Sequence, residues 1–206
     1  MGQNVFVAGY SKFQLGTNSK ADVEPSKVKN TSAIYEYQYG GTGQSTDGVF
    51  KGVDCSYVVW RSLKDAGYQV PDQKFGTSKL FNGDVVSDYA NTNFDFISKS
   101  NTLAQNGNLQ VGDIIMFRSK TGNGQHVGIF FGYDAAGDPL FYGSQTSTGP
   151  AIANMTPGST WNGKSFDVVG ALRPKDSFYN PANDTTLTVT DTPQSSQSFI
   201  DGVKSD

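Results

Sequence analysis

The chain of 206 residues contains a single cysteine, Cys55, and a single histidine, His126. A cysteine thiolate is a strong nucleophile, and an imidazole can take up or release a proton near neutral pH, so the pair could hydrolyse or transfer an acyl group. Their wide separation in the sequence is no obstacle, because a fold can bring a catalytic cysteine and histidine together from distant segments. The alternatives are a buried, unreactive thiol and a hydrogen-bonded core or turn histidine.

The same counts exclude two other uses of these residue types. One cysteine cannot form an internal disulfide, and the chain lacks the several Cys and His side chains of a typical zinc site. We therefore expect no metal site and no cofactor.

An amphipathic helix is predicted immediately after Cys55. The apolar positions with helical spacing are Val58, Val59, Leu63 and Ala66, and the polar positions on the other side are Arg61, Lys64 and Asp65. Gly67 supplies a stop signal, and Asp54 precedes the run, where a carboxylate can cap free backbone amides. Cys55 is therefore expected at a helix N-terminus, where the helix dipole and unpaired amides lower the pKa of a thiol.

Four apolar or alternating runs follow in the second half of the chain: LQVGDIIMF, HVGIFFGY, DPLFYGSQ and FDVVGALRP. Gly, Asp and Asn turns separate them, which is typical of an antiparallel sheet. The order of helix and then strands predicts an α+β fold with helices on one side of the sheet. His126 begins the second run, so we expect it at the start of a strand, at the sheet edge and facing a cleft.

Composition and charge exclude several classes of protein. A mass of 22.1 kDa suits one domain. The 16 basic and 19 acidic residues give a net charge of -3, and no run of Lys or Arg could neutralise a row of phosphates, so nucleic acid is not an expected partner. No stretch approaches the roughly 20 apolar residues of a membrane span, and the first residues lack the basic and apolar regions of a signal peptide. We expect neither a transmembrane segment nor an export signal in this chain.

Three segments are predicted from the changes of pattern along the chain. Residues 1–33 show no sustained period and form an N-terminal extension that wraps the core or is partly disordered. Residues 34–175 contain the helix and the strands and form the catalytic domain. Residues 176–206 are rich in Ser, Thr, Asp and Pro and have few apolar anchors, so we expect a polar, flexible C-terminal tail.

Five motifs, in order, resemble those of the NlpC family of cell-wall cysteine peptidases, a branch of the papain-like enzymes. They are Tyr37-Gln-Tyr39-Gly40-Gly41, Val53-Asp54-Cys55-Ser56, the run from Leu109 to Phe117, the run from His126 to Gly132, and Val169-Gly170-Ala171-Leu-Arg173. The similarity covers about residues 35 to 174. It implies a papain-like α+β fold in which a nucleophile helix packs on a central antiparallel sheet, with Cys55 as the nucleophile and His126 as the base.

The resemblance also implies substrate contacts. Tyr37, Asp54 and Ser56 match positions that help to bind the substrate peptide in the family. The Tyr37 hydroxyl could assist the Cys55 backbone N–H in holding an oxyanion, and Asp54 could equally serve only as a helix cap. The family usually has Ser-Gly after the cysteine, whereas this chain has Ser56-Tyr57, so we expect Tyr57 to alter the shape of the cleft and of its substrate.

The third catalytic residue departs from the family pattern. In the family, a His or another polar residue on the strand after the histidine strand orients the imidazole, but the corresponding position here is Gly143. Gln145 lies two residues further on and faces the same side of a strand, so it is the predicted orienting residue. Ser144, Asn154 or a backbone carbonyl are alternatives, and Gln145 could also merely pair with a loop.

The resemblance implies a substrate class. The family cuts peptide stems of bacterial peptidoglycan at the bond between γ-D-glutamate and diaminopimelate, or at a nearby amide. Two alternatives remain for this chain. One is a papain-like acyltransferase or lipid-acting hydrolase with an apolar cleft, and the other is a catalytically inactive module that binds the cell wall.

With no export signal expected, an enzyme that acts on an extracytoplasmic polymer needs another route. We therefore expect a secreted antibacterial effector, delivered to the periplasm of a target cell by a contact-dependent machine such as a type VI secretion system, or a lysin released by a phage. Besides peptidoglycan, the expected partners are an immunity protein or a component of the secretion machine.

Overall fold

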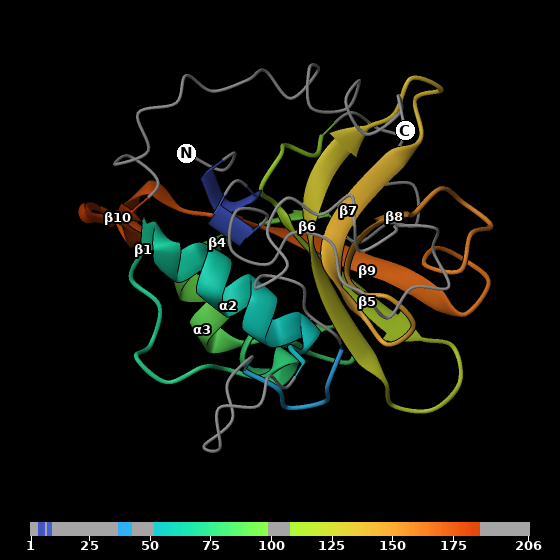
Figure 1. Cartoon of the computed structure of the whole chain (residues 1–206), viewed down its shortest axis with the longest axis horizontal. Coiled ribbons are helices and arrows are strands. Elements are labelled where there is room, and N and C mark those ends of the chain that lie inside the picture. Colours follow the sequence, from blue (N-terminus) through green and yellow to red (C-terminus); the bar gives the residue numbers. More distant parts are fainter. Residues whose placement is uncertain (1–3, 7, 10–36, 43–51, 99–107, 186–206) are drawn as a thin grey trace, which may run out of the picture.

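The computed structural model describes residues 4–6, 8–9, 37–42, 52–98 and 108–185, and the statements below concern these residues (Figure 1). Most of the predicted N-terminal extension and the end of the predicted C-terminal tail lie outside them. The described residues form a helical layer packed on a six-stranded sheet. None of their helices is long and apolar enough to cross a membrane.

The main sheet has antiparallel strands in the order β4-β9-β5-β6-β7-β8. Their bounds are β4 (Phe94–Ser98), β5 (Ile114–Ser119), β6 (Gln125–Tyr133), β7 (Pro139–Gln145), β8 (Gly149–Asn154) and β9 (Phe166–Pro174). Strands β5 to β8 pair with their neighbours in sequence, whereas β9 returns to lie between β4 and β5. The four predicted strand runs are confirmed as β5, β6, β7 and β9.

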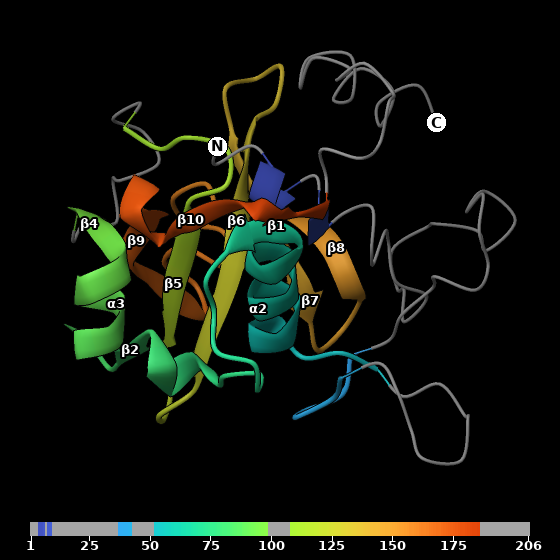
Figure 2. The same ribbon diagram turned by 90° about the vertical axis from the view of Figure 1, so that its left-hand side faces the viewer.

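Helix α2 (Cys55–Asp65) is the helix predicted after Asp54. The Asp54 side chain accepts a hydrogen bond from the Tyr57 backbone N–H and thereby caps the helix N-terminus. Just beyond the helix end, Gly67 has a φ of 88°, a conformation in which a Cβ would be strained. The helix packs on β6 and β7 through a face that is buried at Val58, Val59 and Leu63 (Figures 1 and 2).

Shorter elements complete the fold. They are β1 (Ala66–Tyr68), which pairs with β10 (Tyr179–Asp184); the hairpin β2 (Phe81–Asn82) and β3 (Val85–Val86); helix α3 (Asp88–Asn93); and the 3-10 turns η3 (Thr77–Lys79) and η5 (Asp176–Phe178). The predicted α+β arrangement, a nucleophile helix on an antiparallel sheet, is confirmed.

The core lies on both faces of the sheet, because successive strand residues point to opposite sides. On the face toward α2, the buried residues of the main sheet are Phe94, Ile114, Met116, Val127, Ile129, Phe131, Tyr142 and Leu172, which pack with Cys55 and other residues of α2. On the other face they are Ile115, Phe117, Phe130, Phe141, Val168 and Ala171, which pack with Leu109 and Met155. We call these sets the helix-side cluster and the outer cluster.

Both predicted terminal segments contribute to the folded unit. In the N-terminal extension, the Phe6 ring lies 4.7 Å from Phe131 and 5.8 Å from Tyr142. The predicted flexible tail from residue 176 begins instead with η5 and β10. Phe178 is buried there and anchors the segment, a contribution that the overall polarity of the tail concealed. The folded unit therefore extends past the predicted boundary at 175.

A buried ion pair joins the start of β5 to β9. Arg173 donates from Nε to Oδ1 of Asp113 at 2.8 Å and from a terminal nitrogen to Oδ2 at 2.7 Å. Asp113 also accepts from the Gln110 backbone N–H at 2.8 Å and is nearly inaccessible to solvent. Because the carboxylate has left water, its partners are needed to offset the cost of its burial.

Replacing Arg173 with Met should lower the free energy of unfolding by roughly 2–4 kcal/mol, because the Asp113 carboxylate would stay buried without its cation. Urea unfolding followed by circular dichroism measures the change. The matched control is Arg118→Met, which breaks the exposed pair with Asp84 and should cost less than about 1 kcal/mol. Equal effects of the two substitutions would contradict the assigned role of the buried pair.

Candidate active site

Cys55 is the first residue of α2, as the sequence predicts, and its side chain is buried. The backbone amide of Val127, on β6, hydrogen-bonds to the thiol. The nitrogen of this amide is bonded to the carbonyl carbon of His126, so the fold brings the sulfur next to the backbone of the predicted base. The helix start therefore brings the thiol next to the backbone of His126, whereas the thiol itself packs with the helix-side cluster and the imidazole packs among the rings of the outer cluster.

The pKa of Cys55 differs from the sequence prediction. Burial raises the pKa of the thiol to about 11, and the negative charge of Asp54 acts in the same direction. The backbone amides of Val127, Ser56 and Cys55 itself lower the pKa, as expected at a helix N-terminus, but they do not outweigh the loss of water around the sulfur. At neutral pH the resting group is a thiol.

His126 is the second residue of β6 and pairs with Phe117 of β5. The predicted position at the start of a strand is confirmed; β6 lies inside the sheet, but its pairing with β7 begins only at Ile129, so at His126 it pairs with β5 alone. The side chain is only 6% exposed and packs among the aromatic rings of the outer cluster. The expectation of an imidazole that faces an open cleft is therefore not met.

Burial also determines the charge of the imidazole. It lowers the pKa of His126 to about 3, because a charged ring would lose its hydration there. Its Nε2 atom is buried and has no hydrogen-bond partner. Among the described residues, no hydrogen bond joins the imidazole to the thiol, so the resting pair consists of two neutral groups that are linked through the Val127 backbone.

Gln145, the predicted orienting residue, is buried at the end of β7 but does not hold the imidazole. Its Nε2 donates to the Ala151 carbonyl at 3.4 Å, and its Oε1 accepts from Thr148 Oγ1 at 3.2 Å. With the amide oxygen and nitrogen exchanged, as the surroundings favour, the nitrogen donates to the carbonyls of Gly143 at 2.7 Å and Gly149 at 2.8 Å. In either orientation the amide bonds within the β7–β8 hairpin, and the predicted hydrogen bond to His126 is absent.

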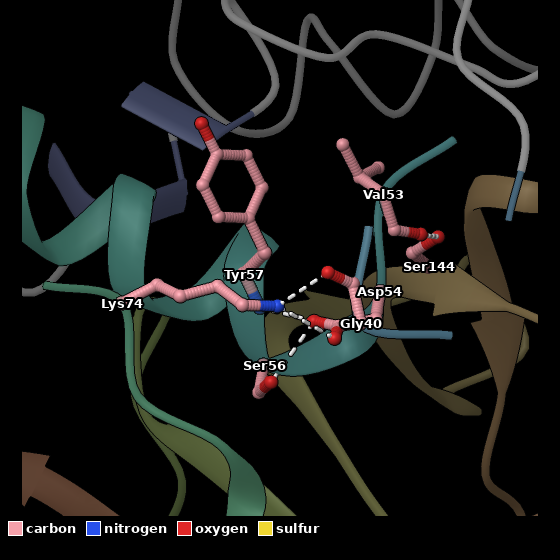
Figure 3. Close-up of polar contacts among 7 residues, drawn as sticks. All are labelled: Gly40, Val53, Asp54, Ser56, Tyr57, Lys74 and Ser144. Atoms are coloured by element: carbon pink, nitrogen blue, oxygen red, sulfur yellow. Dashed lines mark hydrogen bonds and ion pairs between the residues drawn. The ribbon is translucent and has the colours of Figure 1, made fainter. Parts of the chain in front are cut away.

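The alternative orienting residues bond elsewhere as well. Ser144 Oγ donates to the Val53 carbonyl at 2.7 Å (Figure 3). Asn154 Oδ1 accepts from the Thr156 backbone N–H at 2.7 Å. At Gly143, an added Cβ would lie 3.3 Å from the Val127 carbonyl oxygen. No described side chain therefore supplies the hydrogen bond that orients the imidazole in the family pattern.

Asp54 is the polar centre beside Cys55 (Figure 3). Its Oδ1 accepts from the Tyr57 backbone N–H at 2.6 Å and from Ser56 Oγ at 2.9 Å. Its Oδ2 lies 3.2 Å from Lys74 Nζ, which also donates to the Gly40 carbonyl at 2.7 Å. The predicted substrate contacts Asp54 and Ser56 thus bond to each other and to the helix. The cap is confirmed, and their contact with a substrate stays a prediction.

Lys74 has no sequence signal that would have singled it out. It is one of several lysines in a polar stretch, and its importance comes from a contact between segments that are distant in the chain. Its ammonium group contacts both the Gly40 carbonyl and the Asp54 carboxylate, and so links the turn at Gly40 to the N-cap of α2.

The tyrosine motif lies against the residues that precede α2. Tyr37 bridges to Val53, and the Gly41 N–H donates to the Gln38 carbonyl at 2.8 Å in a turn. The turn approaches the backbone so closely that a Cβ on Gly41 would lie 1.9 Å from the Gly52 carbonyl oxygen. Only glycine fits there, which explains the second glycine of the motif.

Tyr37 lies within electrostatic range of the nucleophile. Burial, and then the charges of Cys55 and Asp54, raise the pKa of its hydroxyl to about 12, while a hydrogen bond with Thr146 acts in the opposite direction. Tyr37 therefore keeps its proton at neutral pH and is able to donate it in a hydrogen bond.

Tyr57, the bulky residue where the family has glycine, stacks on Trp60 with a ring-centroid distance of 5.6 Å and an interplanar angle of 29°. Both rings come from α2, and Tyr57 is half-buried against the helix-side cluster. Its effect on the shape of a substrate stays a prediction.

The described residues contain no group of three or more His, Cys, Asp or Glu side chains that could hold a metal ion. In the comparisons with known proteins, the model of the NlpC/P60 family matches residues 35–162. The matched segment includes the tyrosine motif, Cys55, His126 and Gln145. No curated protein matches the chain.

Replacing Asp54 with Ala should lower the free energy of unfolding by about 1–2 kcal/mol, because the cap of α2 is lost. Asp54→Asn keeps a capping oxygen and loses only the charge, and Lys74→Met removes the other half of the ion pair, so each should cost less than about 1 kcal/mol. Thermal and urea unfolding compare the three. A loss for Asp54→Asn as large as that for Asp54→Ala would contradict the cap as the main contribution.

The single cysteine makes alkylation by iodoacetamide specific for Cys55. A thiol whose pKa is raised to about 11 stays protonated to higher pH, so the rate for the native protein should rise continuously from about pH 6 to about pH 10 and, near pH 8, stay at least tenfold below that of the urea-unfolded chain. The unfolded chain is the control for intrinsic reactivity. A plateau of the native rate below about pH 8 would indicate a thiolate paired with an imidazolium and contradict the neutral resting pair.

Proposed function

Because the chain belongs to the NlpC/P60 family, whose members are cell-wall cysteine peptidases, we propose that it hydrolyses an amide bond in the peptide stems of bacterial peptidoglycan. The bond we propose is the one between γ-D-glutamate and diaminopimelate, or an amide near it. One observation carries the proposal: Cys55 begins a capped helix with its thiol against the amide that follows His126, within the matched segment.

In the proposed reaction, Cys55 Sγ attacks the carbonyl carbon of the scissile amide and its proton passes to His126. The amine then leaves with the proton from His126, and a thioester joins the acyl group to Cys55. Water, activated by His126 as the base, hydrolyses the thioester and restores the thiol.

The negative charge that develops on the carbonyl oxygen needs donors. The Cys55 backbone N–H lies at the first position of α2, where amides have no partner within the helix. The protonated Tyr37 hydroxyl is the second proposed donor, and the electrostatic effect of Cys55 on its pKa, which places the hydroxyl near the thiol, supports this assignment. Both donors are fixed before the substrate arrives, because the Asp54 cap and the Gly40–Gly41 turn hold their segments.

The resting neutrality of Cys55 and His126 shapes the proposed mechanism. Burial disfavours the thiolate and the imidazolium alike. A preformed ion pair is therefore not part of the proposal, and the proton moves while the bond between sulfur and carbon forms. The charges then appear together, where their mutual attraction is strong because water is scarce.

A second candidate is a catalytically inactive module that binds the cell wall. The observation in its favour is the buried Nε2 of His126, which lacks the orienting partner of the family pattern. An acyltransferase or lipid-acting hydrolase would use the same Cys55 and His126 on another acyl group, and the experiment below separates these candidates.

We further propose that the enzyme acts on cells other than the one that makes it, as a secreted antibacterial effector or a lysin. Cleavage of the wall in the periplasm of a target cell is toxic, so a producing cell would need an immunity protein as a partner. Expression directed to the periplasm, with and without Cys55→Ala, tests toxicity independently of the route of delivery.

Digestion of purified peptidoglycan sacculi tests the proposed function. The wild-type chain should release peptide fragments with new free amines, identified by mass analysis of the muropeptides, and the fragment masses locate the bond. Cys55→Ala and His126→Ala should each lower the rate by at least about 10³-fold. Arg118→Met, on the surface, is the matched control and should keep the wild-type rate.

Other outcomes are equally decisive. Binding to sacculi without cleavage would favour the inactive module, and release of acyl groups from lipid substrates would favour the acyl-transfer alternative. Cleavage that survives in Cys55→Ala would exclude this residue as the nucleophile.

A further inference from the structure

The imidazole of His126 is not oriented by a hydrogen bond at its buried nitrogen. Nε2 is enclosed without a partner, Gly143 provides no side chain at the usual orienting position, and Gln145 bonds within its own hairpin. A buried ring without such a bond can keep one orientation only through packing. The rings around His126 therefore determine where its nitrogens point.

Four aromatic rings surround the imidazole. The centroid distances from His126 are 4.5 Å to Trp161, 5.8 Å to Phe117, 6.0 Å to Phe141 and 6.4 Å to Phe166. Trp161 is the nearest and, with an interplanar angle of 31°, also the closest to parallel. The other three meet the imidazole at angles of 41°, 71° and 56°. Among the described rings, Trp161 is therefore the one best placed to restrain the plane of the imidazole.

Trp161 is itself held firmly. Phe166 stacks on it with a centroid distance of 4.6 Å and an interplanar angle of 26°. The next residue in its turn, Asn162, is buried and donates from its side chain to the Met155 carbonyl at 3.0 Å. Trp161 is half-buried, so it forms the outer wall of the cluster between His126 and solvent. Because these contacts hold Trp161 in place, its ring can keep the neighbouring imidazole of His126 in one position.

We propose that Trp161 is the positioning residue of His126, and that close packing of the two rings replaces the polar third residue that orients the imidazole in the family pattern. The inference rests on the proposed function, since it concerns the base of that reaction. The packed indole restrains the plane of the imidazole and excludes water from it. Unlike a carboxylate, it supplies no charge that would stabilise an imidazolium, which agrees with the neutral His126 of the resting structure.

A purely structural role for Trp161 predicts different behaviour. In that case its truncation would lower stability as any large-to-small change in the outer cluster does, and leave the imidazole unchanged. Phe130 offers the matched comparison, because it is more deeply buried in the same cluster and its ring packs on Tyr133 at 5.3 Å. The substitution Phe130→Leu therefore measures the effect of a truncation that does not touch His126.

The experiment combines kinetics with nuclear magnetic resonance on the full chain. His126 is the only histidine, so its imidazole signals are assigned without ambiguity. Trp161→Leu should lower kcat on muropeptides about tenfold with KM within about twofold. It should also move the titration midpoint of His126 toward the ordinary value of 6.5. Trp161→Phe keeps an aromatic face and should retain most of kcat, and Phe130→Leu should change stability only.

The resonance measurement needs no activity, so it separates this proposal from the proposed function. If the wild type cleaves no peptidoglycan but Trp161→Leu still shifts the His126 titration, the peptidase proposal fails and the positioning role stands. Unchanged His126 signals in Trp161→Leu, or equal shifts in Phe130→Leu, would overturn the positioning role. Should Trp161→Leu fail to fold, Trp161→Met, which fills more of the volume without a ring, takes its place: it should shift the titration midpoint in the same direction, and no shift overturns the proposal.

Discussion

The carboxylate of Asp54 determines where helix α2 begins, and the position of Cys55 follows from that start. One oxygen caps the helix and bonds to Ser56, and the other pairs with Lys74, which also holds the Gly40 carbonyl. A single side chain thus joins the tyrosine motif, the nucleophile helix and the loop after β1. Because the first turn of a helix frays readily, this junction keeps the thiol pointed at β6.

The exclusion of water is the second constraint on the site. The thiol belongs to the helix-side cluster, and the imidazole packs into the outer cluster, so each group is surrounded by apolar side chains. Both are consequently neutral at rest, and the site stores no ion pair. In such surroundings, polar groups such as the two proposed donors, the Cys55 N–H and the Tyr37 hydroxyl, interact more strongly with a nearby charge than they would in water.

The local spacing of apolar residues was sufficient to predict the helix and the strands. It was insufficient to predict the surroundings of their side chains. The helical spacing after Asp54 and the alternating runs correctly placed Cys55 at a helix start and His126 on a strand. Three properties depend on contacts between distant segments and were missed: the raised pKa of Cys55, the burial of His126 among aromatic rings, and the Lys74 contact. Likewise, β10 forms because β1 pairs with it, and the polar sequence of the tail gives no local signal for this strand.

The place of β9 in the sheet has a consequence for biosynthesis. It is the last strand of the main sheet to leave the ribosome, yet it lies between β4 and β5. Until it inserts, both neighbours expose unpaired backbone edges, and Asp113 lacks the Arg173 guanidinium. A nascent chain that already carries α2 and the strands β5 to β8 is thus an open sheet that can pair with other chains, and only translation through the end of β9 closes it.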